Sequence, residues 1–165
     1  MKGRRVVDLA GYPDLVVMYL GMKVERPAGL ATLLGFGPKI TRAVKERPEG
    51  LLLHETLIVS LWPPHLGMRQ YWRDFDALER WARSGIHKDW WQRFLRDPKG
   101  TSFWHETYFM RGGMEAIYDH TTTPIGLMRF APVNEARGSM FSARRRLGIG
   151  GTSTTESPIA ERDLY

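Results

Sequence analysis

The segment Leu51–Ser60 reads LLLHETLIVS, and Leu66–Trp72, which reads LGMRQYW, follows it after Pro63-Pro64. Both segments are rich in residues that favour strands, and a proline pair is typical of a turn. The two segments therefore predict a hairpin with a short irregular loop. This hairpin lies in the middle of the predicted domain.

A strand and a helix are predicted before the hairpin. Asp14–Val24 is apolar at both alternating sets of positions, which is typical of a strand covered on both faces. Pro27 then suits the first turn of a helix. The segment GFGP at Gly35–Pro38 predicts a break in that helix, which resumes over Ile40–Glu46.

A second helix and further strands are predicted after the hairpin. Asp74 can cap a helix in which apolar residues recur every four positions from Leu78 to Phe94. Ser102–Met110 is predicted to be a strand, and a glycine pair turns the chain into a short partner strand, Glu115–His120. The order predicts an α+β fold, a ferredoxin-like βαββαβ unit with an extra C-terminal hairpin strand.

Two short motifs occur twice. Leu20–Lys23 reads LGMK and Leu66–Arg69 reads LGMR, while the sequence HET occurs at His54–Thr56 and at His105–Thr107. Because both pairs recur in the same order and flank helices of similar length, they indicate two halves with matching roles.

Length and composition favour one domain with an arm. The chain has 165 residues, of which 42% are hydrophobic, which suits a single core. We expect residues 1–133 to form the ferredoxin-like domain. Residues 134–165 are rich in Gly, Ser, Thr and Arg, and we expect a C-terminal arm or tail that cannot fold alone.

Composition also excludes several classes of function. The chain lacks cysteine, which excludes disulfides, thiolate nucleophiles and cysteine-ligated metals. Its net charge of +6 is scattered rather than gathered in a stripe, so we expect no nucleic-acid partner. No apolar stretch has the length of a membrane span and no signal peptide is evident, so we expect a cytoplasmic protein with no membrane partner.

The two HET strands carry the candidate chemistry. Strand alternation places His54 and His105 on the face opposite to the glutamate that follows each, so no His–Glu pair forms within one motif. If that face lines a cavity, a neutral imidazole could be a general base, a haem-iron ligand or a hydrogen-bond donor. The alternative is an ordinary half-buried histidine.

Glu55 and Glu106 lie on apolar strands, so each must be paired, protonated or solvated at a rim. Arg69 and Arg111 are plausible partners in structural ion pairs. A carboxyl group with a raised pKa, acting as an acid or base, is the alternative.

His87 is the third candidate histidine. If Gly85 ends one helical segment, His87 begins the next, where the helix dipole keeps the imidazole neutral. Trp90 and Trp91 would then give a flat ligand an aromatic wall, and Tyr118 could orient a ligand. The candidate catalytic residues are thus His105, Glu106 and His87, the candidate cofactor-binding residues His87, Trp90 and Trp91, and the candidate substrate-binding residues His54, Trp104, Tyr108 and Tyr118.

From Val17 to Phe130 the chain resembles a monooxygenase-like family, formerly a domain of unknown function, whose named member is a fungal terpenoid-pathway monooxygenase. The residues that carry the resemblance are His54-Glu55, Phe75–Leu78 leading to His87, Trp104–Tyr108, Glu115, Ile117-Tyr118 and Gly126-Leu127. That family is similar to the dimeric α/β-barrel superfamily, which includes antibiotic-biosynthesis monooxygenases, haem-degrading enzymes, chlorite dismutases and aldoxime dehydratases.

The resemblance implies a homodimer whose two sheets close into a barrel, with a ligand cavity between each sheet and its helices or loops. In several haem-binding relatives a histidine on or near a helix holds the iron. Only His87 matches that placement in this chain, which makes it the implied iron ligand if haem is bound.

Two functions stay open. The first is an oxygenase-like enzyme of secondary metabolism that acts on a hydrophobic substrate, with or without haem, by monooxygenation or aldoxime-dehydratase-like chemistry. The second is a non-catalytic dimeric module that binds a hydrophobic ligand or a partner protein. The sequence leaves open whether haem, flavin or no cofactor is bound.

Overall fold

The computed structural model describes residues 4–84, 98–110, 113–114, 116–118, 124, 126–141 and 146. The chain divides into two compact units, one formed by residues 14–109 and the other by residues 1–13 together with 110–165. Each unit has its own sheet. None of the helices described is long and apolar enough to cross a membrane.

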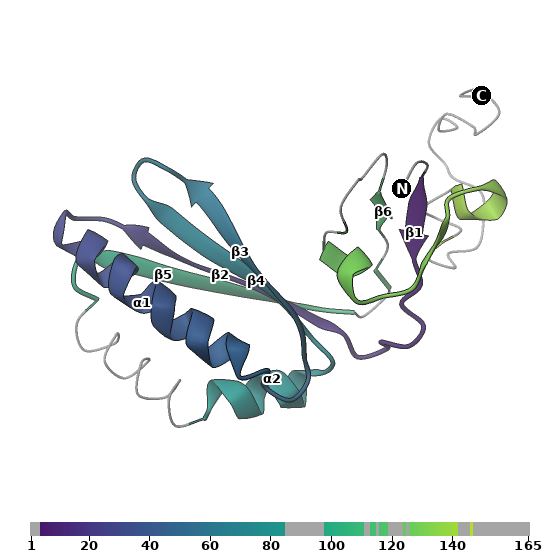
Figure 1. Ribbon diagram of the computed structural model, residues 1–165, viewed down its shortest axis with the longest axis horizontal. Coiled ribbons are helices and arrows are strands. Elements are labelled where there is room, and N and C mark those ends of the chain that lie inside the picture. The colour runs from purple at the N-terminus through teal and green to yellow at the C-terminus, as the bar shows by residue number, and fades with distance from the viewer. Residues whose placement is uncertain are drawn as a thin grey trace. The chain divides into compact units, whose positions relative to one another are not determined.

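The unit of residues 14–109 has the predicted ferredoxin-like order. Its elements are β2 (Val16–Val24), α1 (Ala28–Lys45), β3 (Leu51–Ser60), β4 (His65–Trp72), α2 (Phe75–Ala82) and β5 (Thr101–Phe109). The strands pair antiparallel in the order β3-β4-β2-β5, and both helices lie on one face of the sheet (Figure 1). The predicted α+β fold class is confirmed.

The hydrophobic core of this unit lies where α2 meets the sheet. Val16 and Trp72, which are Cα partners on β2 and β4, pack with Ala77 and Leu78 of α2. The helix begins where predicted, because the Asp74 carboxylate accepts a 2.7 Å hydrogen bond from the backbone N–H of Ala77.

Helix α1 runs without interruption from Ala28 to Lys45, so the predicted break at Gly35–Pro38 is wrong. Pro38 lies inside the helix, although proline removes one backbone hydrogen bond there. Leu33 is buried on the sheet-facing side. Tertiary packing of an apolar face supplies most of a helix's stability, and here it outweighs the local preference for a break.

The repeated motifs occupy equivalent places in the two strand-helix-strand halves. Gly21 and Gly67, the glycines of the two LGM motifs, are Cα partners on the two central strands. The two HET motifs lie on β3 and β5, the two edge strands of the sheet. The sequence repeat therefore follows the approximate symmetry of the sheet.

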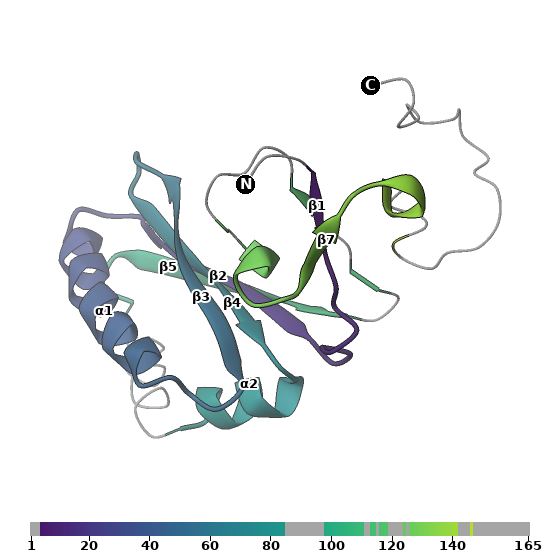
Figure 2. The ribbon, with the colours of Figure 1, turned by 45° about the vertical axis from the view of Figure 1, so that its right-hand side comes forward.

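The second unit is built around a strand that was not predicted. Strand β1 (Arg5–Val7) pairs with β6 (Ile117–Tyr118) and with β7 (Val133–Glu135) in the order β6-β1-β7 (Figure 2). Two short 3-10 helices, at Gly126–Arg129 and Gly138–Phe141, complete the described part of this unit.

This second sheet differs from the predicted arrangement in the partner of β6. β6, expected to pair with the strand before it, pairs with β1 instead, and Val6 at the centre of β1 is fully buried. The expected limit between residues 133 and 134 falls within β7. The backbone N–H of Ala136 donates a 3.0 Å hydrogen bond to the carbonyl of Arg4, so the chain stays in this unit beyond that limit.

Candidate functional site

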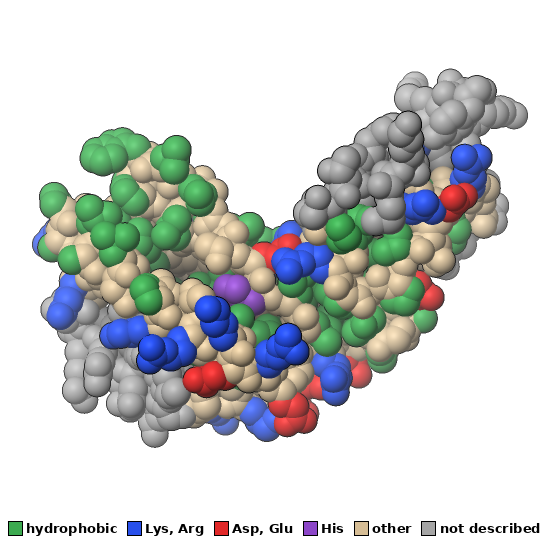
Figure 3. Space-filling view, in the orientation of Figure 1, with side chains coloured by type: hydrophobic (Ala, Val, Ile, Leu, Met, Phe, Trp, Pro, Cys, Tyr) green, Lys and Arg blue, Asp and Glu red, His purple; other side chains and the backbone are tan. Residues whose placement is uncertain are grey.

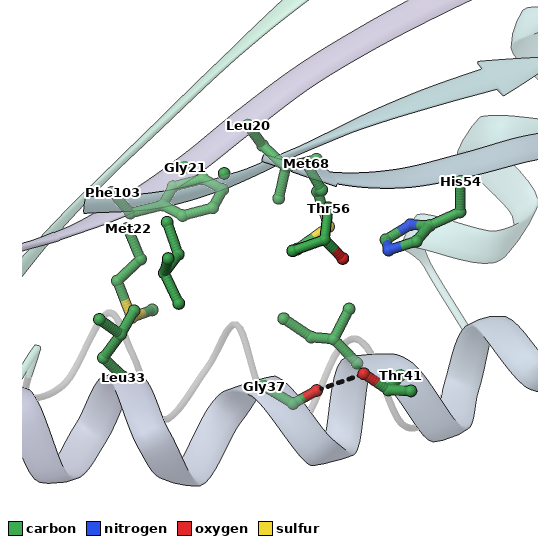
Figure 4. Close-up of a pocket in the computed structure, with 13 residues that line it drawn as sticks. Leu20, Gly21, Met22, Leu33, Gly37, Thr41, His54, Thr56, Met68 and Phe103 are labelled. Atoms are coloured by element: carbon green, nitrogen blue, oxygen red, sulfur yellow. Dashed lines mark hydrogen bonds between the residues drawn. The ribbon is translucent and has the colours of Figure 1, made fainter. Parts of the chain in front are cut away.

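A cavity of about 110 Å³ lies between the sheet and α1 within the unit of residues 14–109 (Figure 4). All four strands and α1 contribute residues to its wall. Strand alternation explains which side chains reach it, because positions of one parity face the helices. Among the lining residues that the structure describes, His54 is the one titratable side chain.

The cavity has a polar end and an apolar end. His54, Thr56 and Thr41 lie toward one end, while Met22, Leu33 and Phe103 lie toward the other (Figure 4). The Thr41 hydroxyl donates a 3.0 Å hydrogen bond to the carbonyl of Gly37. Its oxygen therefore keeps only acceptor capacity for a ligand.

Two buried side chains determine which nitrogen of the neutral His54 ring carries the proton. The indole N–H of Trp72 donates to Oε1 of Gln70 at 3.1 Å, and Nε2 of Gln70 lies 3.3 Å from Nδ1 of His54. An indole N–H can only donate, so the amide oxygen must face Trp72 and the NH₂ group must face the imidazole. An NH₂ group also only donates. Nδ1 of His54 therefore accepts, and the neutral ring carries its proton on Nε2.

The surroundings of His54 favour this neutral form. Burial lowers the pKa of His54 below its ordinary value, and the nearby charge of Glu55 only partly opposes that shift. The imidazole points into the cavity (Figure 4). Because Nδ1 is occupied by Gln70, His54 offers a ligand the Nε2–H donor.

The other HET histidine does not line this cavity. His105 pairs with Leu20 across the sheet and so faces the helices, as His54 does. It is exposed on the edge strand, and its ring centroid lies 6.0 Å from that of Phe103. The structure therefore brings Phe103, but not His105, to the wall of the cavity.

Three predicted site residues of β5 lie on the opposite face of the sheet. The Tyr108 hydroxyl donates to the carboxylate of Glu106, and this hydrogen bond raises the pKa of Tyr108. The indole N–H of Trp104 donates to Nε2 of His65 at 2.8 Å. The predicted separation of each histidine from its neighbouring glutamate is observed. Glu106, Trp104 and Tyr108 do not share a site with His54.

Glu55 forms the ion pair predicted as one of its roles. Its carboxylate accepts hydrogen bonds from Nε and Nη2 of Arg69 at 2.9 and 2.7 Å, and Nη1 of Arg69 donates to the hydroxyl of Tyr19 at 3.0 Å. Burial opposes the charge of Arg69, but the hydrogen bonds that Arg69 donates to Tyr19 and Glu55 outweigh this effect and raise the pKa of Arg69. Glu55, Arg69 and Tyr19 thus form a hydrogen-bonded cluster on the sheet face opposite the helices.

Several predicted site residues lie outside the described part of the chain. They are His87, Trp90, Trp91, Arg111 and the side chain of Tyr118. Their roles stay predictions. Conversely, Gln70 was not predicted, although a single amide among the apolar and aromatic residues of LGMRQYW was a usable signal.

Haem does not fit the cavity that is described. The cavity of about 110 Å³ is far smaller than the macrocycle, and Nε2 of His54 keeps its proton. An iron-ligating histidine instead donates Nδ1–H to an acceptor and leaves Nε2 free. Across the described residues, no group of three His, Asp or Glu side chains could hold a metal ion.

Comparison with known proteins identifies the family. Residues 15–127 match the family model described as Monooxygenase af470-like. No curated protein matches the sequence significantly. Two of the solved structures that share the fold are aldoxime dehydratases. The first is an aldoxime dehydratase, with a TM-score of 0.67, 23% identity, and coverage of 89% of this chain and 44% of that chain.

The second is the aldoxime dehydratase OxdRE in complex with butyraldoxime, with a TM-score of 0.68, 20% identity, and coverage of 90% of this chain and 43% of that chain. The chain spans less than half the length of either enzyme. The family model, in contrast, covers more than half of this chain and agrees with the resemblance carried by the HET strands. The protein belongs to the monooxygenase af470-like family.

Proposed function

We propose that the chain is an oxygenase-like enzyme that binds a hydrophobic substrate, of the kind found in secondary metabolism, in the cavity between the sheet and α1. His54 donates a hydrogen bond from Nε2 to an oxygen of that substrate. One observation carries the proposal: in the described part of the wall, a single titratable side chain is held in one tautomer among uncharged residues. Membership of a monooxygenase-like family supports oxygen chemistry.

The neutral imidazole suits a substrate that carries an uncharged oxygen atom, such as a phenol, an enol or an alcohol. An N–H donor that binds this oxygen holds the substrate in one orientation against the apolar surface. Such a donor is more effective in an apolar site that excludes water than in bulk solvent. Met22, Leu33 and Phe103 provide that apolar surface.

The test uses 2-naphthol as a probe, because its anion absorbs at longer wavelength than the neutral form. We expect the wild-type protein to bind 2-naphthol in its neutral form and to consume oxygen in its presence. The variant His54→Leu should lose both effects. If His105→Ala loses them and His54→Leu does not, the functional site lies at β5 and the proposal is wrong.

A haem-dependent version with His87 as the iron ligand is a second candidate, which the fold similarity to aldoxime dehydratases favours. Its test is the absorption spectrum of the protein purified from its native host. A Soret band that His87→Ala removes, together with dehydration of butyraldoxime, would establish this version. Colourless protein that takes up no added haemin would eliminate it.

We propose further that two chains associate through the sheet face opposite the helices, which carries Tyr19, Trp104 and Tyr108. A single sheet with helices on one side has a second face to cover. Sedimentation velocity should show a homodimer, and a monomer would contradict this arrangement. Binding of 2-naphthol without oxygen consumption, unchanged in His54→Leu, would favour the non-catalytic module.

A further inference from the structure

The apolar end of the cavity continues onto exposed apolar side chains of α1. Leu33 and Gly37 line the cavity, and Leu30 and Leu34 lie on the same stripe of the helix by the i, i+3, i+4 rule. Yet Leu34 is 65% exposed and Leu30 is 45% exposed. These two leucines therefore lie beside the cavity-lining positions of the helix and leave much of their apolar surface exposed.

The hairpin of β3 and β4 presents matching side chains across from α1. Ile58 and Leu66 are Cα partners, and Leu66 lines the cavity. Ile58 shares the helix-facing side with Thr56, two residues before it, but it is 66% exposed. Leu30, Leu34, Ile58 and Leu66 together form what we call the apolar rim. Hydrophobic side chains gather over the hairpin and the first half of α1 in the space-filling view (Figure 3).

The size of the cavity indicates that a ligand must extend beyond it. The enclosed volume is about 110 Å³, whereas pockets that enclose a ligand usually hold roughly 300–1,000 Å³. A ligand of ordinary size that places its oxygen at His54 would therefore project past Met22 and Leu33. The surface that it meets on leaving is the apolar rim.

The charges of the cavity wall restrict which polar group of a ligand can lie at His54. His54 is neutral, and the lining residues within the described ranges include no Lys or Arg. A carboxylate placed at His54 would be buried without a counter-charge, which costs several kcal/mol. An uncharged oxygen group avoids this cost and can still accept the Nε2–H hydrogen bond.

From these observations we infer that the site binds a single-chain amphiphile with an uncharged oxygen headgroup at His54 and an alkyl chain that leaves the cavity across the apolar rim. The inference rests on the proposed function only in taking His54 as the anchor. It adds the substrate class, which the proposed function leaves open. Binding can be measured without turnover.

The test is a series of 1-alkanols, from 1-butanol to 1-decanol, measured by displacement of 2-naphthol from the wild-type protein. Affinity should rise about fourfold per methylene group while the chain lies against apolar surface. Decanoate should bind at least about tenfold more weakly than 1-decanol. Affinity that does not depend on chain length, or equal binding of decanoate, would overturn the inference.

The variant Leu34→Glu separates the rim from the cavity. It should weaken 1-decanol about tenfold and leave 1-butanol unchanged, because only the longer chain reaches Leu34. The matched control is Leu61→Glu, which places the same charge at an 80% exposed leucine in the hairpin turn, outside the rim. Thermal melting monitors the folding of both variants, and Ile58→Glu replaces Leu34→Glu if the latter does not fold.

The remaining outcomes separate this inference from the proposed function. Equal loss of 1-decanol affinity in Leu34→Glu and Leu61→Glu would overturn the inference. A change of sedimentation coefficient in Leu34→Glu, without a change in alkanol binding, would make the rim an interface between copies and would also overturn it. A normal alkanol series without any oxygen consumption would leave the inference standing and contradict the proposed enzyme.

Discussion

Gln70 holds His54 by placing its amide nitrogen 3.3 Å from Nδ1 of the imidazole. Gln70 is fully buried, and its oxygen is occupied by the N–H of Trp72, a fully buried residue of the core. A buried amide with both ends engaged cannot turn over without leaving a polar group unpaired. The packing of Trp72 against α2 is thereby connected to the proton position at the cavity.

Replacing the NH₂ donor of Gln70 by a hydrogen-bond acceptor should move the proton of the neutral His54 ring from Nε2 to Nδ1. In Gln70→Glu the carboxylate can accept from both Trp72 and Nδ1–H of His54, so we expect the neutral ring to lose its proton from Nε2 and the pKa of His54 to rise. The loss of the Nε2–H donor should weaken the binding of 2-naphthol about tenfold. NMR titration of the His54 ring measures the pKa directly.

His65 provides an internal control for that experiment. Its Nε2 accepts from the indole N–H of Trp104 at 2.8 Å, so its neutral ring carries the proton on Nδ1. This tautomer should be unchanged in Gln70→Glu. If the His54 ring keeps its wild-type tautomer and pKa in Gln70→Glu, then Gln70 does not determine the protonation of His54.

Stability should fall as the pH is lowered below the ordinary pKa of histidine. Because the pKa of His54 is lower in the folded state, the unfolded chain binds more protons between the folded pKa and about 6.5. Stability is therefore complete above pH 6.5 and decreases as the pH falls through the folded pKa. Urea unfolding from pH 7 to pH 5 should show this decrease in the wild type and a smaller one in His54→Gln.

The ion pair between Glu55 and Arg69 should contribute measurably to stability. The two side chains are 13% and 27% exposed, so Glu55→Gln leaves a largely buried guanidinium without its counter-charge and should cost about 2 kcal/mol. The control, Glu79→Gln, removes an exposed i, i+4 pair with Arg83 and should change stability by less than about 0.5 kcal/mol. If Glu55→Gln and Glu79→Gln lower the free energy of urea unfolding equally, the Glu55–Arg69 pair contributes no more than an exposed pair, and the prediction is wrong.

Gly21 leaves room for the contact between Trp104 and His65. A Cβ at Gly21 would lie 2.7 Å from Nε1 of Trp104 and 2.9 Å from Nε2 of His65. Gly21→Ala should therefore displace the indole and destabilise the protein by about 1–3 kcal/mol. Gly35→Ala in α1 meets no atom within 4 Å and should stabilise the helix by roughly 0.5–1 kcal/mol. If the melting temperatures of Gly21→Ala and Gly35→Ala shift in the same direction, one of these two expectations is wrong.

The order of the elements in residues 14–109 could be predicted from the sequence because each signal is local. Strand alternation, the Asp74 cap and the proline pair each act within a few residues. The continuous α1 could not be predicted, since the packing of Leu33 against the sheet overrides the local effect of Pro38. β1 is only three residues long, and its pairing with β6 joins positions more than 100 residues apart.

The candidate site was predicted only in part for the same reason. Alternation assigned His54 and Glu55 to opposite faces, and the structure agrees. Which histidine has a cavity beside it depends on where α1 packs, and that is a long-range property. The role of Gln70 depends on Trp72 two residues away and on His54 across the hairpin, so a residue-by-residue reading overlooks it.

The position of the proton on His54 is the most direct test of the proposed site. The ¹⁵N chemical shifts of the wild-type ring at neutral pH report whether Nδ1 or Nε2 is protonated. We predict a neutral His54 with its proton on Nε2, facing the cavity. A neutral ring with its proton on Nδ1, or a ring fully protonated at pH 7, would contradict the account.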